Sequence, residues 1–158
     1  MKSRLDWFTA APGAAHALLQ VQMVVNKSGL EPALLELVKL RTSQINGCAY
    51  CIDMHTKDAR AAGETEQRLY LLDAWHEATH LYTERERAAL AWAEAVTRLE
   101  QRVPDEVFEQ VRGHFSDAEL VNLTLAITAI NSWNRMNVAF RAQAGGYRPG
   151  MFKHAVGE

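Results

Sequence analysis

The sequence predicts an all-α protein in which residues 1–158 form a single-domain bundle of about six to seven helices. Two observations support this fold class. Apolar side chains recur at helical spacing in several long segments, and no segment alternates between apolar and polar residues as a strand does. The chain has 158 residues, of which 48% are hydrophobic, which is enough for one domain with a substantial core.

The first half of the chain contains three predicted helices, over residues 12–27, 32–46 and 48–63. Pro32 suits the first turn of the second helix. Asn46-Gly47 is a strong helix-breaking pair, so the chain should reverse there. Gly63 is a suitable stop for the third helix.

The second half contains four further predicted helices, over residues 64–74, 84–100, 104–113 and 117–144. Capping boxes at Thr83-x-x-Glu86 and Ser116-x-x-Glu119 start two of them. The last helix, ended by Gly145-Gly146, has almost no polar face in its first half and is expected to run through the core or a subunit interface. The tail from Tyr147 to Glu158 is expected to be loose unless a neighbouring subunit holds it.

Both cysteines of the chain lie at the N-terminus of the third predicted helix. Cys48, Cys51 and His55 are spaced i, i+3 and i+7, which places them on one helix face. Glu36 lies in an apolar run on the preceding helix. If the two helices are antiparallel, Glu36 and His55 lie at similar distances from the turn, because each helical residue rises about 1.5 Å. We therefore expect Glu36 to be buried and to contact His55, directly or through one water.

These side chains suit thiol redox chemistry. Only a thiolate attacks a peroxide or a disulfide. His55 can take the thiol proton, Glu36 can orient the imidazole, and the second cysteine can trap a sulfenic acid as a disulfide. The helix dipole favours Cys48 by about 0.3–1 kcal/mol, whereas a nearby base contributes about 10²–10⁴-fold in rate. We therefore predict that Cys51 attacks and that Cys48, the more exposed thiol, resolves.

Other interpretations of these residues stay open. The cysteine pair could be half a zinc site or two inert core thiols. The stretch His76-Glu77-Ala78-Thr79-His80 matches a zinc-protease pattern, with Glu100 as a possible third ligand. That motif needs one continuous helix through both histidines, whereas the capping box at Thr83 starts a new helix just after it. We therefore expect no metal and no other cofactor.

The second half of the last predicted helix mixes polar and apolar residues, namely Asn131, Trp133, Asn134, Arg135, Met136 and Asn137. One interpretation is a polar network that fixes contacts between helices or subunits. The other is a rim around an active-site pocket, with Trp133 as an apolar wall. The candidate substrate-pocket residues are Tyr50, Trp133 and Asn134.

The run from Glu36 to His55 resembles the AhpD-like alkylhydroperoxidases of the carboxymuconolactone decarboxylase superfamily, whose spacing Glu-x11-Cys-x2-Cys-x3-His it meets in full. The likeness continues through residues 83–90 and 131–137 and so covers most of the chain. It implies a homo-oligomer, commonly a trimer or a hexamer, that reduces organic hydroperoxides through a Cys48/Cys51 disulfide cycle with a Glu36–His55 proton relay. One departure is Tyr50, which stands where some characterised peroxidases of the family have a histidine.

Two rival functions belong to other classes of protein. A decarboxylase or lactone-opening acid–base enzyme would match the other branch of the superfamily, but that chemistry needs no dithiol. A redox sensor or disulfide-exchange module with poor peroxidase turnover is the second rival, and Tyr50 keeps it open.

Composition limits the partners. The net charge of −2 and the lack of a basic stretch with interleaved aromatics argue against nucleic acid and anionic membranes. No segment reaches the roughly 18 apolar residues of a membrane span, and no signal peptide is visible. Two closely spaced cysteines suit a reducing compartment, so we expect a cytoplasmic protein. Without a nucleotide-binding glycine pattern, electrons must come from an external dithiol.

Overall fold

The structure, a computed structural model, describes residues 2–99 and 102–152. This part of the chain forms eight α-helices and two 3₁₀-helices: α1 (Trp7–Ala10), α2 (Pro12–Asn26), α3 (Pro32–Ile45), α4 (Ala49–Ala61), α5 (Glu66–Leu71), η1 (Leu72–Ala74), η2 (Thr79–Leu81), α6 (Glu84–Arg98), α7 (Asp105–Arg112) and α8 (Asp117–Phe140). None of the described residues is in a strand, so the all-α prediction is confirmed. The sequence did not predict α1, which is a single turn.

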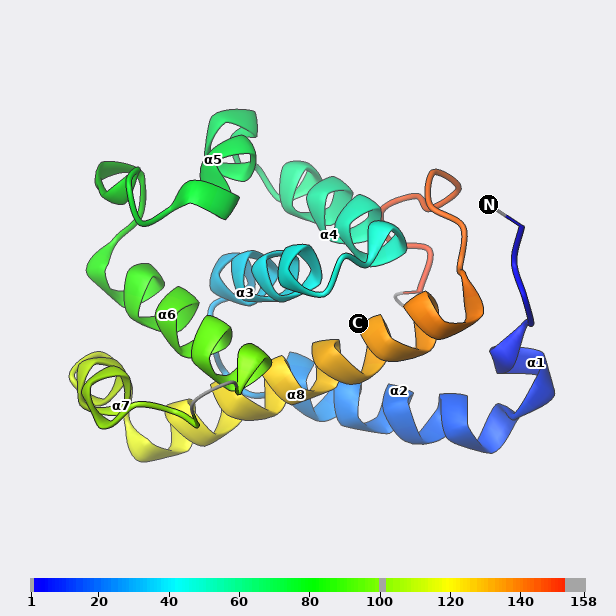
Figure 1. The fold of residues 1–158 in the computed structure, drawn as a ribbon, viewed down its shortest axis with the longest axis horizontal. Helices are drawn as coiled ribbons and strands as arrows, with labels where there is room; N and C mark the ends of the chain where they lie inside the picture. Colours follow the sequence, from blue (N-terminus) through cyan, green and yellow to red (C-terminus); the bar gives the residue numbers. More distant parts are fainter. Residues whose placement is uncertain (1, 100–101, 153–158) are drawn as a thin grey trace.

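Helix α3 lies at the centre of the bundle. It packs against α4, α6 and α8, and Figure 1 shows α8 running along one side of the molecule with α2 beside it. Leu37, Val38 and Leu40 of α3 are fully buried. A helix that is apolar on most sides has no face to present to water, and this explains its central position.

The described apolar core is divided into three clusters. The largest joins α2, α3, α6 and α8, and a second joins α3, α4, α5 and α6. Cys48 and Cys51 belong to neither, because they form a third cluster with Ile130 of α8. The cysteine pair therefore lies in an apolar contact between the start of α4 and the second half of α8.

Helix starts follow the predicted capping boxes, whereas several helices end earlier than predicted. The helix predicted over residues 64–74 is divided into α5, which ends at Leu71, and η1. Both boxes, at Thr83 and Ser116, are formed in full. Helix α8 ends at Phe140 instead of about residue 144, because Arg141 adopts a left-handed φ of 57°. Helix α6 likewise stops before Leu99, whose φ is 51°.

The zinc-protease pattern is not on one helix. His76 lies in a turn and His80 in η2, and His76 Nε2 contacts the Glu94 carboxylate at 3.4 Å. The motif requires a single helix through both histidines, so its geometry is not formed here. Glu100 lies outside the described residues.

The segment after α8 returns to α4, and the prediction of a loose tail is wrong for its first residue. Tyr147 is buried, and its hydroxyl donates to the carboxylate of Asp58 at 2.8 Å. Residues 153–158 of that predicted tail lie outside the described residues. Among the helices that are described, none is both long and apolar enough to cross a membrane.

Candidate active site

The turn between α3 and α4 places the cysteines. Gly47 has a φ of +65°, a left-handed conformation that glycine adopts without steric cost. The backbone N–H of Cys48 then donates to the Ser43 carbonyl at 3.0 Å, and Cys48 becomes the N-cap of α4. The predicted reversal at Asn46-Gly47 and the predicted position of the cysteine pair at a helix N-terminus are confirmed.

The two sulfurs form a close pair. Cys48 Sγ and Cys51 Sγ are both free thiols, 2.6 Å apart, and the backbone N–H of Cys51 donates to Cys48 Sγ at 3.4 Å. The hydrogen bond shared with Cys51 lowers the pKa of Cys48 to about 7, although burial opposes it. The same shared hydrogen bond, together with burial, raises the pKa of Cys51. In the resting pair the negative charge is therefore favoured on Cys48.

The expectation that Cys48 is the more exposed thiol is wrong. Cys48 is 1% exposed and Cys51 is 0% exposed, so accessibility does not distinguish them in this chain. Cys48 is covered because its sulfur turns inward as the helix cap, and Ile130 packs against the pair.

The predicted contact between Glu36 and His55 is present. Glu36 Oε2 lies 2.8 Å from His55 Nδ1, and Lys39 Nζ donates to the other carboxylate oxygen at 2.9 Å. The Glu36 side chain is 17% exposed, so it is mostly rather than fully buried. Burial alone would raise the pKa of Glu36, but His55 and Lys39 together lower it to about 2. The carboxylate is therefore charged at neutral pH and holds the imidazole in place.

The other nitrogen of His55 has no partner. His55 is buried, and its Nε2 makes no hydrogen bond to any described protein group. His55 lies one turn after Cys51 on α4, so this nitrogen is on the same helix face as the cysteines. A buried polar atom without a partner is costly to maintain and is typical of sites where a reaction uses it.

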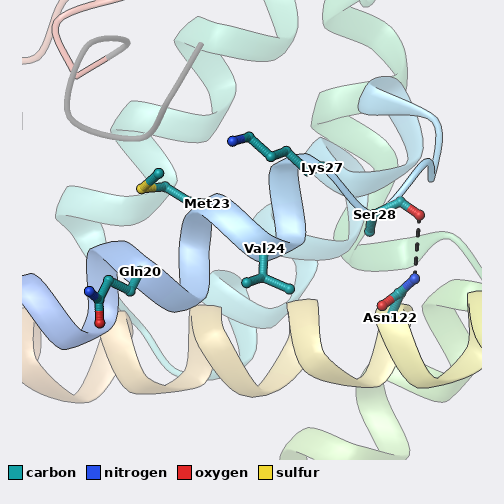
Figure 2. A pocket seen from close by; sticks show the side chains of 6 residues that line it. All are labelled: Gln20, Met23, Val24, Lys27, Ser28 and Asn122. Carbon is teal, nitrogen blue, oxygen red and sulfur yellow. Dashed lines mark hydrogen bonds between the residues drawn. The ribbon is translucent and has the colours of Figure 1, made fainter.

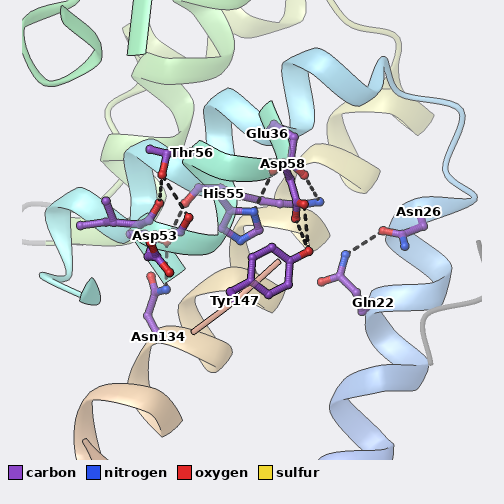
Figure 3. A network of polar contacts seen from close by, with 12 residues as sticks. Gln22, Asn26, Glu36, Asp53, His55, Thr56, Asp58, Asn134 and Tyr147 are labelled. Carbon is purple, nitrogen blue, oxygen red and sulfur yellow. Dashed lines mark hydrogen bonds and ion pairs between the residues drawn. The ribbon is translucent and has the colours of Figure 1, made fainter. Parts of the chain in front are cut away.

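An acid–base cluster continues beyond the predicted pair. Glu36, His55 and Asp58 have ligand-type atoms that all lie within 4.8 Å of one another, the one such group among the described residues. The two carboxylates already bind Lys39 and Tyr147, so we assign no metal to this cluster. The cysteines are not part of it. Figure 3 shows the Tyr147 ring beside His55 and Asp58.

Amide side chains from α8 connect the turn to the cysteines. Asn134 Nδ2 donates to Ser43 Oγ at 3.0 Å, and Asn46 Nδ2 donates to Asn134 Oδ1 at 2.9 Å. Asn137 Nδ2 donates to Cys51 Sγ at 3.4 Å. Asn134 is fully buried, and its hydrogen bonds to Ser43 and Asn46 support the turn. The network interpretation of this polar stripe is therefore the one that the geometry favours.

The other two candidate pocket residues do lie beside the sulfurs. Tyr50 and Trp133 are partly buried and pack against the cysteine cluster. Trp133 also contacts two aromatic rings of α1, with centroids 5.7 Å away for Trp7 and 6.0 Å away for Phe8. Tyr50 and Trp133 are thus positioned to contact a molecule that approaches the cysteines.

Neither of two described cavities is lined by the cysteines. The first, of about 460 Å³, lies between α2 and the first half of α8, where Asn122 donates to the Ser28 carbonyl (Figure 2). None of the predicted site residues lines it. The second, of about 170 Å³, is lined by Ala33 and Glu36 of α3, by Ala59 of α4 and by residues 62–64 after α4. It accounts for the partial exposure of the Glu36 carboxylate.

Sequence reasoning missed four residues of this site. Ser43 and Asn137 were not named as site residues, and Asp58 and Tyr147 were not considered together. Asn137 had a signal in the sequence, because it is a polar residue three positions after Asn134 on an apolar helix. Tyr147 had none, because its position depends on the path of the segment after α8.

A helical fold with a Cys-x-x-Cys pair at a helix N-terminus and a Glu–His pair beside it defines a class of AhpD-like proteins. The model of the Carboxymuconolactone decarboxylase family matches residues 12–95. The chain is 43% identical over 145 residues to the uncharacterized protein YdfG of Bacillus subtilis (strain 168). This alignment covers 91% of this chain and 98% of YdfG. The chain belongs to the carboxymuconolactone decarboxylase family.

Solved structures agree with this placement. ATU0492 from Agrobacterium tumefaciens, a protein of unknown function that has been proposed to be the antioxidant defence protein AhpD, is similar with a TM-score of 0.88 and 46% identity. The match covers 92% of this chain and all of ATU0492. The debrominase Bmp8 has the same fold, with a TM-score of 0.78 and 21% identity over 88% of this chain and 75% of Bmp8. The resemblance to AhpD-like proteins is confirmed.

Proposed function

We propose that this chain is a thiol-dependent peroxidase that reduces organic hydroperoxides with the Cys48/Cys51 pair. The observation that carries the proposal is His55, whose Nδ1 is held by Glu36 while its buried Nε2 has no partner, one turn after Cys51. A base placed in this way can take the proton of a thiol that burial would otherwise keep neutral. Buried thiols without such a base are inert.

The proposed cycle begins with Cys51. Its proton passes to His55 Nε2, directly or through a water, and the thiolate attacks one peroxide oxygen. The O–O bond breaks, the alcohol leaves with a proton, and Cys51 becomes a sulfenic acid. Cys48 then attacks that sulfur, so that a disulfide forms and water leaves. Two electrons have moved from the cysteine pair to the peroxide.

An external dithiol completes the cycle. One of its thiolates attacks the disulfide to give a mixed disulfide, and its second thiol releases the reduced cysteine pair. A reducing compartment such as the cytoplasm would supply this reductant.

The competing assignment of the attacking sulfur has support as well. The lowered pKa of Cys48 favours it as the resting thiolate. We retain Cys51 because His55 follows it by one turn, and general-base assistance contributes about 10²–10⁴-fold, more than a helix dipole supplies.

Turnover tests the proposal against the sensor alternative. Purified protein is supplied with an organic hydroperoxide and a dithiol, and peroxide consumption is followed. We expect Cys51→Ser to abolish turnover, His55→Ala to lower it by about 10²–10⁴-fold, and Glu36→Gln to lower it without unfolding the protein. His76→Ala is the matched control and should leave the rate unchanged, because the His76 imidazole contacts Glu94 and is not part of the cysteine cluster. Wild-type turnover no faster than that of Cys51→Ser would refute the peroxidase and leave a sensor.

A further inference from the structure

The segment after α8 is fastened to α4 by three side chains. Asp53 accepts from the backbone N–H of Gly145 at 2.9 Å, and Lys57 Nζ donates to the Tyr147 carbonyl at 3.1 Å. The Tyr147 hydroxyl lies 2.8 Å from each oxygen of the Asp58 carboxylate. Asp53 and Asp58 therefore both anchor this segment, but only Asp58 also lies beside Glu36 and His55.

The charged groups around His55 leave one negative charge, that of Asp58, without a cation. Helix α3 contributes Glu36 and Lys39, whose opposite charges form an ion pair at 2.9 Å. Helix α4 contributes Asp58, and the segment after α8 contributes the neutral hydroxyl of Tyr147. Lys57 is turned away, since it binds Asp53 and carbonyls of the segment. With a neutral imidazole, Asp58 is the carboxylate in this group that no cation neutralises.

Tyr147 holds the Asp58 carboxylate in place. Both oxygens of Asp58 accept from one hydroxyl, an arrangement that suits an ionised carboxylate. Burial and the neighbouring carboxylate raise the pKa of Tyr147, so the phenol keeps its proton and remains a donor. Burial raises the pKa of Asp58 above its usual value, and the Tyr147 hydroxyl opposes this shift without cancelling it.

We propose that Asp58, held by Tyr147, is a positioning residue of the proton relay, whose charge balances the positive charge that His55 acquires from Cys51. The proposal rests on the proton transfer in the proposed function. The proton leaves the Cys51 thiol and binds His55 Nε2, so a thiolate and an imidazolium replace two neutral groups. A buried imidazolium needs a counter-charge. The single charge of Glu36, which contacts His55 through Oε2, is shared with Lys39 at Oε1.

Thiolate formation tests this directly and needs no peroxide. In a Cys48→Ser background, the ultraviolet absorbance of the Cys51 thiolate is followed against pH for Asp58→Asn and for the parent. We expect Asp58→Asn to reduce the thiolate population near neutral pH by about tenfold or more, because a charge within a few ångströms of the imidazole is lost. The curves should converge at high pH, where the thiol ionises without His55.

Asp53→Asn is the matched control, because it loosens the same segment without removing the charge beside His55. It should follow the parent curve. Tyr147→Phe should lower the thiolate population in the same pH range as Asp58→Asn. If Asp58→Asn does not fold, the thiolate curve of Tyr147→Phe tests the proposal in its place. An Asp58→Asn curve equal to the parent, or an equal loss in Asp53→Asn, would overturn the proposal.

The outcome is separable from that of the peroxidase assay. A thiolate that depends on Asp58 in a protein without peroxide turnover would support this inference and refute the proposed function. Peroxide turnover in a protein whose thiolate population does not change in Asp58→Asn and Tyr147→Phe would support the proposed function and refute this inference.

Discussion

Glu36 is a residue of the candidate active site whose ionisation is coupled to folding. Burial would raise its pKa, but His55 and Lys39 lower it from 4.5 to about 2. A carboxyl group with a lowered folded-state pKa stabilises the fold above its unfolded pKa, and the contribution is lost as pH falls through the folded value. For Glu36 this window runs from pH 4.5 down to about 2.

We predict that Glu36→Gln lowers the free energy of unfolding by on the order of 3 kcal/mol at neutral pH. Glutamine keeps the shape of the side chain but not its charge, so the difference from wild type should shrink as the wild-type carboxyl is protonated. Denaturant titrations of both proteins across the pH range measure this. A difference that stays constant from neutral pH down to about pH 2 would contradict the assigned electrostatics.

We predict that Cys51 is the sulfur that peroxide oxidises first. In Cys48→Ser, hydroperoxide should leave a sulfenic acid on Cys51 that a dimedone-type reagent traps, because His55 still serves as its base. Mass spectrometry of the labelled peptide identifies the residue. If the reagent labels Cys48 in Cys51→Ser and nothing in Cys48→Ser, the lowered pKa of Cys48 has outweighed the base and the order is reversed.

At the residue scale, the sequence predicted the contact between two helices that are joined by one tight turn. It missed contacts between residues that lie far apart in the chain. Glu36 and His55 are on neighbouring helices joined by a tight turn, so counting residues from that turn was enough. Asp58 and Tyr147 are separated by 89 positions. Their contact requires α8 to end at Phe140 and the chain to return to α4, and no periodic pattern encodes that path.

The element that most directly sets the site is the turn between α3 and α4. We predict that Gly47→Ala destabilises the protein by about 1–2 kcal/mol, because an L-residue is strained at a φ of +65°. Thermal and denaturant unfolding measure the change. Gly13→Ala is the control, since a Cβ there meets nothing within 4 Å and its φ is not left-handed, so it should leave stability unchanged or slightly raised. Equal effects of the two substitutions would show that the turn is not strained by alanine.

Helix starts could be predicted because their signals are local. In the capping boxes at Thr83 and Ser116, the hydroxyl and the carboxylate that cap the helix are three residues apart. The ends of α6 and α8 could not be predicted in this way, because Leu99 and Arg141 adopt left-handed conformations without being glycine. After Arg141, the backbone N–H of Ala142 closes the end of α8 by donating to the Asn137 carbonyl at 2.9 Å. A sequence rule based on glycine places that end too late.

At the scale of the whole molecule, we expect copies of this chain to associate as a trimer or a hexamer. Apolar side chains of α2 and α8 remain exposed on the single chain, including Val24 at 55% and Val121 at 67%. Light scattering coupled to size exclusion should give three or six times the chain mass of 17.7 kDa. A mass equal to one chain at micromolar concentration would contradict this expectation.

The central claim is that hydroperoxide converts the two thiols of each chain into one disulfide that a dithiol can reduce. The most direct measurement is a thiol titration of the denatured protein before and after a small excess of organic hydroperoxide. We predict a loss of both thiols per chain, since Cys48 and Cys51 are the only cysteines, and full recovery after dithiol treatment. No loss of thiols, or a loss that dithiol does not restore, would contradict the account.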